Sequence, residues 1–196
     1  MIAMHDEGPF AKPDGAAPAP YSPQRAALDL AVRRLDEAER ERQPAAMCDA
    51  LTGIARCYRA LSAYAHAMDF LRQALRWSYA LGGVDQQVDL LCELAELSCE
   101  AAEDVNGVDD PERHTRTARE CARDMAFEAA RVSGQAADPH WEIKALLRAS
   151  DVLDRCGDHD DAITLQTRAM SLMVQHPDVS DTLIEDHANS RHPLMS

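Results

Sequence analysis

LLRASDVLDRCGDHDDAITLQTRAM, residues 146–170, is the stretch that decides the fold of this chain. Its first half carries apolar or small side chains three and four positions apart, which places them on one helical face: Leu146, Ala149, Ser150 and Leu153. Gly157 suits the left-handed position that ends a helix, and Asp158 is placed to cap a second helix. The second helix has its own apolar face: Ala162, Leu165, Ala169 and Leu172. The stretch therefore predicts a hairpin of two amphipathic helices.

Two further copies of this spacing lie upstream. The first contains Leu51, Ile54, Ala55, Tyr58, Ala67, Leu71 and Ala74, and the second contains Leu91, Leu94, Ala95, Ser98, Ala122, Ala126 and Ala129. The copies start 40 and then 55 positions apart, while the two halves of a copy are 16 positions apart in the outer copies and 31 in the middle one. An insertion of 15 residues at about 103–117 accounts for both differences. A recurring hairpin predicts an all-α repeat fold in which neighbours bury each other's apolar faces.

These residues resemble the tetratricopeptide repeat family. Residues 157–163, GDHDDAI, are similar to that family's turn between helices, and Tyr58, Tyr64, Ala67 and Ala74 match its pattern in the first copy. Ser62 stands at the turn position where the family has glycine. The resemblance covers about residues 45–175, and it implies a right-handed α-solenoid of about three tetratricopeptide-like hairpins with extended repeats. It also implies a protein that works by holding another molecule.

The predicted helical domain covers residues 22–176. Ser22 and Pro23 form a favourable helix start, so an N-terminal helix is expected from there to about residue 43. Its expected buried face is Leu28, Ala31, Val32, Leu35 and Ala38. Further helices are expected at residues 45–61, 64–81, 86–102, 111–132, 139–156 and 159–176. Residues 1–21, which contain four prolines among alanine and glycine, predict a flexible leader. Residues 177–196 are expected to form a tail with a short helix at about 180–188.

Composition narrows the function classes. The formal net charge of −14 disfavours unaided binding to nucleic acid or to an anionic membrane. The six cysteines form no CxxC pair, which indicates a reduced, cytoplasmic chain. The first residues lack the apolar core of a signal peptide, and no apolar run approaches the ~20 residues that span a bilayer. The basic residues are almost all arginine, which we interpret as the mark of a GC-rich, bacterial coding sequence.

The first helices of stacked hairpins line the concave side of a solenoid, which defines a candidate binding groove. Twelve positions are predicted to face outward there: Asp49, Thr52, Arg56, Arg59, Asp89, Cys92, Glu96, Glu100, Lys144, Leu147, Asp151 and Asp154. They predict a groove that is basic at one end and acidic further along, which would steer in a peptide of the opposite charge order. The alternative is that they form solvated helix faces.

No sequence pattern proposes catalysis. The chain has no phosphate-binding loop, nucleophile elbow, HExxH or dinucleotide fingerprint, so we predict that it is not an enzyme and needs no cofactor. Cys156 and His159 have a spacing close to that of zinc ligands, but no second pair answers them. His114 lies among charged residues, where an acid–base role and simple solvation are the two alternatives.

Three functions remain open. The first is a cytoplasmic scaffold that binds a protein or peptide partner in the groove. The second is a bacterial sensory or regulatory domain that binds a small molecule or signal peptide and acts in trans. The third is self-association into a homo-oligomer, because short solenoids expose apolar ends.

Overall fold

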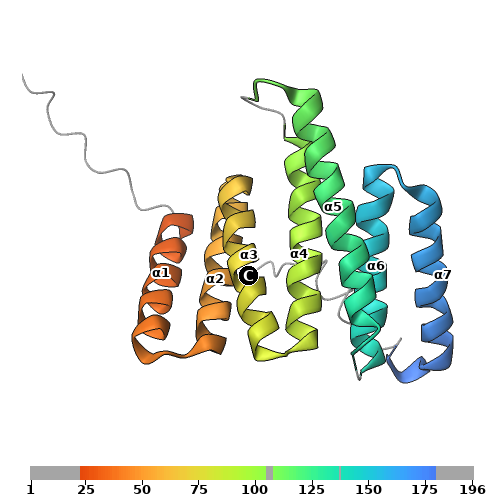
Figure 1. The fold of residues 1–196 in the computed structure, drawn as a ribbon, viewed down its shortest axis with the longest axis horizontal. Coiled ribbons are helices and arrows are strands. Elements are labelled where there is room, and N and C mark those ends of the chain that lie inside the picture. Colours follow the sequence, from red (N-terminus) through yellow and green to blue (C-terminus); the bar gives the residue numbers. More distant parts are fainter. Residues whose placement is uncertain (1–22, 105–107, 137, 180–196) are drawn as a thin grey trace, which may run out of the picture.

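The protein is all-α in a computed structural model that describes residues 23–104, 108–136 and 138–179. Its helices are α1 (Pro23–Glu41), α2 (Pro44–Ala60), α3 (Tyr64–Leu81), α4 (Val84–Glu103), α5 (Pro111–Ser133), α6 (Pro139–Cys156) and α7 (His159–Gln175) (Figure 1). These ranges contain no β-strand. The prediction of an all-α helical repeat fold is therefore confirmed.

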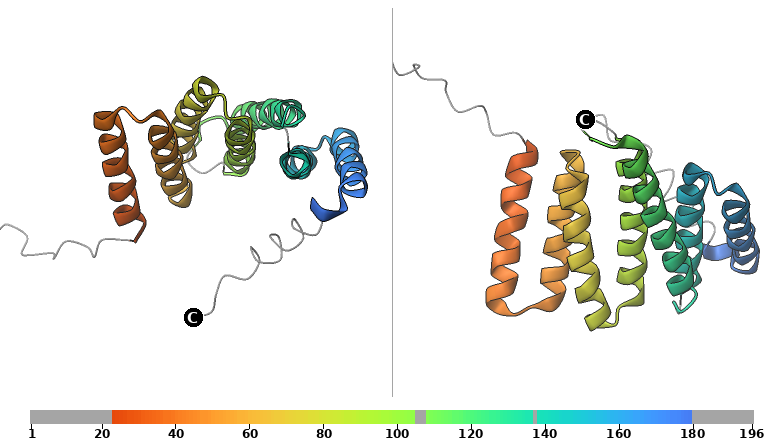
Figure 2. Two further views of the ribbon diagram at one scale, coloured as in Figure 1. Left: turned by 90° about the horizontal axis from the view of Figure 1, so that it is seen from below. Right: turned by 45° about the horizontal axis from the view of Figure 1, so that its top comes forward.

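The helices pack consecutively as antiparallel neighbours. Each packs against the next along the chain, and α4 also packs against α6. In the left view of Figure 2, the first helices of the three hairpins, α2, α4 and α6, lie on one side, and α3 and α5 lie on the other. This arrangement brings one face of α2, α4 and α6 together on a common surface.

The core is built largely from alanine, as the low aromatic content requires. The fully buried alanines include Ala67, Ala74, Ala122, Ala126, Ala129, Ala145 and Ala169. Small side chains let helix backbones approach closely, and the larger leucines of α4 fill the spaces between hairpins. Helix α4 contributes buried residues to all three apolar clusters, so it lies at the centre of the core.

The predicted helix boundaries agree closely with the observed ones. Helices α3 and α6 have the predicted limits, and α5 begins at the predicted Pro111. Within the insertion at about 103–117, Glu103 is the last residue of α4 and residues 111–117 form the first turns of α5. Two aspartates cap helices through their side chains: Asp110 accepts from the Arg113 amide at 3.0 Å, and Asp138 accepts from the His140 amide at 2.9 Å.

Two local expectations are wrong. Asp158 precedes α7 but makes no capping hydrogen bond with its side chain. Its Oδ2 lies 2.7 Å from Arg123 Nε on α5, as an ion pair without hydrogen-bond alignment, because packing brings that cation to the turn. Val32, expected to be buried, is 41% exposed because α1 is the first described helix, and among the described helices its extensive packing is with α2.

Several predictions fall outside the described residues. They are the leader at 1–21, the Ser22 cap and the short helix at 180–188. Among the described helices, none combines the length and the apolar composition needed to cross a bilayer.

The turns of the first and third hairpins provide a matched stability test. Gly157 has φ +91° and an added Cβ would meet no atom within 4 Å, so Gly157→Ala introduces backbone strain alone. We expect it to lower the free energy of unfolding by about 1 kcal/mol. Ser62 occupies the left-handed region at φ +55°. Ser62→Gly should raise that free energy by roughly 0.5 kcal/mol, because the strain relieved exceeds the freedom gained by the unfolded chain.

Urea unfolding followed by circular dichroism measures both changes. An equal loss of unfolding free energy in the two variants would contradict the assignment of Ser62 to a glycine-like turn position.

Candidate functional site: an ion-pair network across three helices

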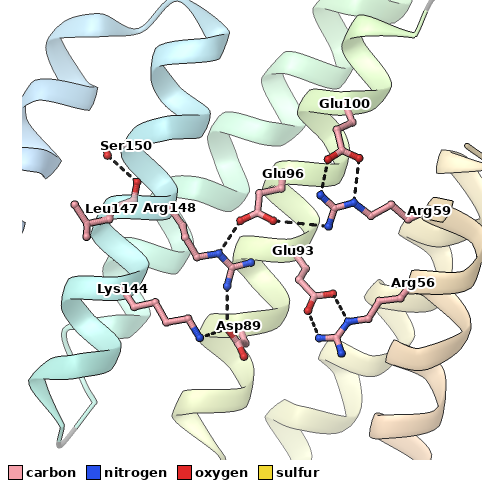
Figure 3. A network of polar contacts seen from close by, with 10 residues as sticks. All are labelled: Arg56, Arg59, Asp89, Glu93, Glu96, Glu100, Lys144, Leu147, Arg148 and Ser150. Carbon is pink, nitrogen blue, oxygen red and sulfur yellow. Dashed lines mark hydrogen bonds and ion pairs between the residues drawn. The ribbon is translucent and has the colours of Figure 1, made fainter. Parts of the chain in front are cut away.

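The candidate surface is formed by charged stripes on α2, α4 and α6. On α4, acidic side chains recur at helical spacing of three and four: Asp89, Glu93, Glu96, Glu100 and Glu103. The facing stripe on α2 includes Arg56 and Arg59, and the stripe on α6 includes Lys144, Arg148 and Arg155. Basic, acidic and basic stripes therefore lie side by side (Figure 3).

Two arginines of α2 bind carboxylates of α4 in a two-pronged manner. Arg56 pairs with Glu93 through both Nε, at 3.3 Å, and Nη2. Arg59 pairs with Glu100 through Nε, at 3.0 Å, and Nη2, and its Nη1 lies 3.8 Å from Glu96 Oε2. Paired contacts of this kind fix orientation as well as distance, because the planar guanidinium matches the carboxylate.

Arg148 of α6 completes the network from the other side of α4. Its Nε donates to Glu96 Oε1 at 2.6 Å and its Nη1 donates to Asp89 Oδ1 at 2.8 Å. The Nζ of Lys144 lies 3.4 Å from the same Asp89 oxygen. Glu96 is shared by Arg59 and Arg148, so the contacts run without a break from α2 through α4 to α6. We call these eight residues the ion-pair network: Arg56, Arg59, Asp89, Glu93, Glu96, Glu100, Lys144 and Arg148.

The environment keeps the arginines of the network charged. Burial by itself lowers the pKa of Arg148, but its hydrogen bond to Glu96 and the surrounding carboxylates outweigh burial and raise the pKa overall. The hydrogen bond to Glu93 raises the pKa of Arg56, and the hydrogen bond to Glu100 raises the pKa of Arg59. These cations therefore stay protonated at any pH at which the protein is handled.

Two of the twelve predicted groove residues do not face outward. Cys92 is only 2% exposed, lies in the apolar cluster with Leu91 and Ala145, and has its pKa raised to about 12 by burial. Thr52 is 9% exposed and its hydroxyl donates to the Cys48 carbonyl at 2.9 Å. The prediction was wrong for both, because helical spacing within one hairpin does not show which of its side chains are covered by a neighbouring helix.

The predicted charge gradient is also wrong. Arg148 and Arg155 on α6 face the acidic stripe of α4, so the surface alternates in sign and much of its charge is neutralised internally. Neither Arg148 nor Glu93 was among the predicted residues. Each had a detectable signal, since Glu93 continues the acidic spacing of α4 and Arg148 lies four positions after Lys144.

The remaining predicted residues lie at the edges of the network. Asp49 accepts from Gln86 Nε2 at 3.2 Å, and Asp154 lies 2.7 Å from His159 Nδ1. Leu147 and Asp151 are exposed on α6. The described ranges hold no group of three or more histidine, cysteine, aspartate or glutamate side chains arranged to bind a metal ion. The chemistry offered by the surface is charge recognition.

The network predicts an unequal response to loss of two arginines. Arg148→Met removes the cation that lies between Glu96 and Asp89. The Arg148 side chain is only 23% exposed. We expect the free energy of unfolding to fall by about 2 kcal/mol, less than for a fully buried pair because solvent screens the site. Arg131→Met is the control, since it breaks a solvated pair with Glu128 within α5. Urea unfolding that shows the same small change for both variants would remove the structural role of Arg148.

Comparison with known proteins assigns no family. No protein-family model matches the chain, and no curated protein matches it. Among solved structures, a "DHF58 filament" is 17% identical over 81% of this chain and 84% of its own, with a TM-score of 0.45. BtubC (BKLC) from P. vanneervenii is 18% identical over 89% of this chain and 78% of its own, with a TM-score of 0.36. Likeness at this level carries no argument about function, and the tetratricopeptide resemblance stays a prediction.

Proposed function

We propose that the protein is an interaction module that binds a basic segment of a partner protein along the face of α2, α4 and α6. The observation that supports this most directly is the surplus of carboxylates on that face. The network and the edge residues together hold seven carboxylates and four cations, and the neighbouring pair of Glu103 and Arg155 adds one of each.

The four cations are already engaged by carboxylates of α4. An acidic partner would have to displace these ion pairs, in which the charged groups are close together and well aligned. A basic partner instead meets carboxylates that retain unused acceptor capacity, chiefly the exposed Asp151 and Asp154 beside Leu147. The sign of the surplus therefore favours a segment rich in lysine or arginine.

The network also prepares the surface for binding. Bridges on both sides of α4 hold the three helices at a set separation, so an incoming segment meets a rigid platform. The net charge of −14 adds a long-range attraction for basic partners. That attraction weakens as salt rises, since the Debye length is about 8 Å at physiological ionic strength.

Peptides of defined charge test this proposal. Fluorescently labelled peptides of equal length, either lysine-rich, neutral or glutamate-rich, are titrated with the protein at low and high salt. We expect binding by the lysine-rich peptide alone, weakened by salt. Asp151→Asn combined with Asp154→Asn should reduce its affinity about three- to tenfold, because two rim charges are lost.

The matched control is Asp124→Asn combined with Asp161→Asn, which removes two exposed carboxylates from α5 and α7. Equal affinity in both double variants, or preference for the acidic peptide, would contradict the assignment of the binding face.

Self-association is a second candidate, favoured by an apolar stripe on the last described helix. Ile163, Met170 and Val174 of α7 are 59%, 64% and 83% exposed. They recur at helical spacing on the face turned away from α6, where a second copy of the chain can cover them. The sensory alternative stays a prediction.

Light scattering distinguishes this candidate from a monomer. We expect the average mass to rise with protein concentration, and Met170→Glu combined with Val174→Glu to keep it at the monomer value. A monomeric mass for the unmodified chain at millimolar concentration would end the candidate.

A further inference from the structure

Two cysteines that are distant in the sequence lie near each other between α4 and α6. Cys99 of α4 is 2% exposed and belongs to the apolar cluster that contains Ile143 and Leu146. Cys156, the last residue of α6, packs against the same cluster. Glu103 Oε1 lies 3.9 Å from Cys99 Sγ and accepts at 2.9 Å from Nη2 of Arg155, the residue before Cys156. Close approach of the two residues is the first requirement for a disulfide.

One of the two thiols also borders solvent. Cys156 lines an open cleft of about 520 Å³ between the first half of α5 and the end of α6, which lie at the same end of the molecule in Figure 1. Arg116, Arg119 and Arg123 line the same cleft. Cys156 is thus reachable by a small solute, whereas Cys99 lies behind it in the core.

Three of the other four cysteines have neighbours other than cysteine. Cys48 donates to the Ala74 carbonyl at 3.3 Å, and Cys92 is buried among apolar side chains. Cys121 lies 3.5 Å from Ser98 Oγ and 3.9 Å from Arg72 Nη2. Proximity therefore selects Cys99 and Cys156 as the pair able to join.

We propose that Cys99 and Cys156 form an intramolecular disulfide when the protein meets a peroxide. The Cys156 thiolate attacks one peroxide oxygen and the O–O bond breaks, which yields a sulfenic acid and hydroxide. The hydroxide takes up the proton that Cys156 lost on ionisation and becomes the first water. The Cys99 sulfur then attacks the sulfenic sulfur, the S–O bond breaks, and a second water leaves with the thiol proton. Two thiols lose two electrons in total and hydrogen peroxide gains them, so the atoms and electrons balance.

The surroundings make this reaction slow at neutral pH. Burial raises the pKa of Cys99 to about 12, with Glu103 and Arg155 nearby. Burial also raises the pKa of Cys156, and Asp158 raises it further. Cys99, Arg119 and Arg123 lower this pKa, but it stays above the ordinary value of a thiol. Since the thiolate is the nucleophile, oxidation needs sustained peroxide at pH 7 and proceeds faster as the pH rises.

The disulfide would tie the end of α6 to the central helix. It closes a loop with 56 residues between Cys99 and Cys156, which restricts the unfolded chain and stabilises the folded one. The bond lies beside the ion pair between Arg155 and Glu103, which already joins the same two helices. This inference does not depend on the proposed partner or its binding face.

Peptide mapping after oxidation tests the proposal. The reduced full-length protein is treated with excess hydrogen peroxide at pH 8, remaining thiols are blocked, and the chain is cleaved after glutamate. Cleavage at Glu93 and Glu96 separates Cys92 from Cys99, so mass spectrometry can assign the linkage. We expect one dominant cross-link between Cys99 and Cys156, a mass lower by two hydrogen atoms, and a Tm several degrees higher that returns with dithiothreitol.

Two variants complete the test. Cys156→Ser changes a half-buried residue and should abolish both the cross-link and the Tm increase, whereas Cys121→Ser should retain them. A cross-link through any other cysteine overturns the proposal. So do intermolecular dimers as the main product, or conversion of Cys156 to sulfinic acid while Cys99 stays a free thiol.

Discussion

The burial of α4 between neighbours on both sides is the constraint on which the rest of the structure depends. Thirteen of its twenty residues are buried. Leu90, Leu94 and Leu97 pack with α2 and α3, and other positions on the same helix pack with α5 and α6. A helix that is apolar on two sides cannot be stable alone or in one hairpin, so the three hairpins form one cooperative stack.

The same constraint explains the ion-pair network. One face of α4 carries a continuous acidic stripe, and like charges repeated every three or four residues repel each other along a helix. Because α4 lies between α2 and α6, cations from both sides can neutralise that stripe. Glu96 shows this most directly, since it accepts from Arg148 and also lies close to Arg59. The surface that results is ordered, nearly satisfied internally, and acidic only at its edges.

Local sequence signals were sufficient for the helices and insufficient for the site. The limits of α3 and α6, the start of α5 and the turn at Gly157 follow from apolar spacing and from backbone preferences. The twelve predicted groove residues lie on the correct helices, but Cys92 and Thr52 are buried, and Arg148 and Glu93 were missed. A helical spacing tells which residues share a face, but it does not tell which neighbour covers that face.

The sequence by itself determined where the helices begin and end, which small residues are buried and where the repeat is interrupted, because these depend on residues within about four positions of each other. Only the tertiary structure decided which charges pair, that Asp158 meets Arg123 instead of capping α7, and that Cys99 and Cys156 pack in the same cluster. The bridging pairs join residues 37 to 59 positions apart. Such partners are set by how α4 packs against its neighbours, and no spacing within a single helix specifies that packing.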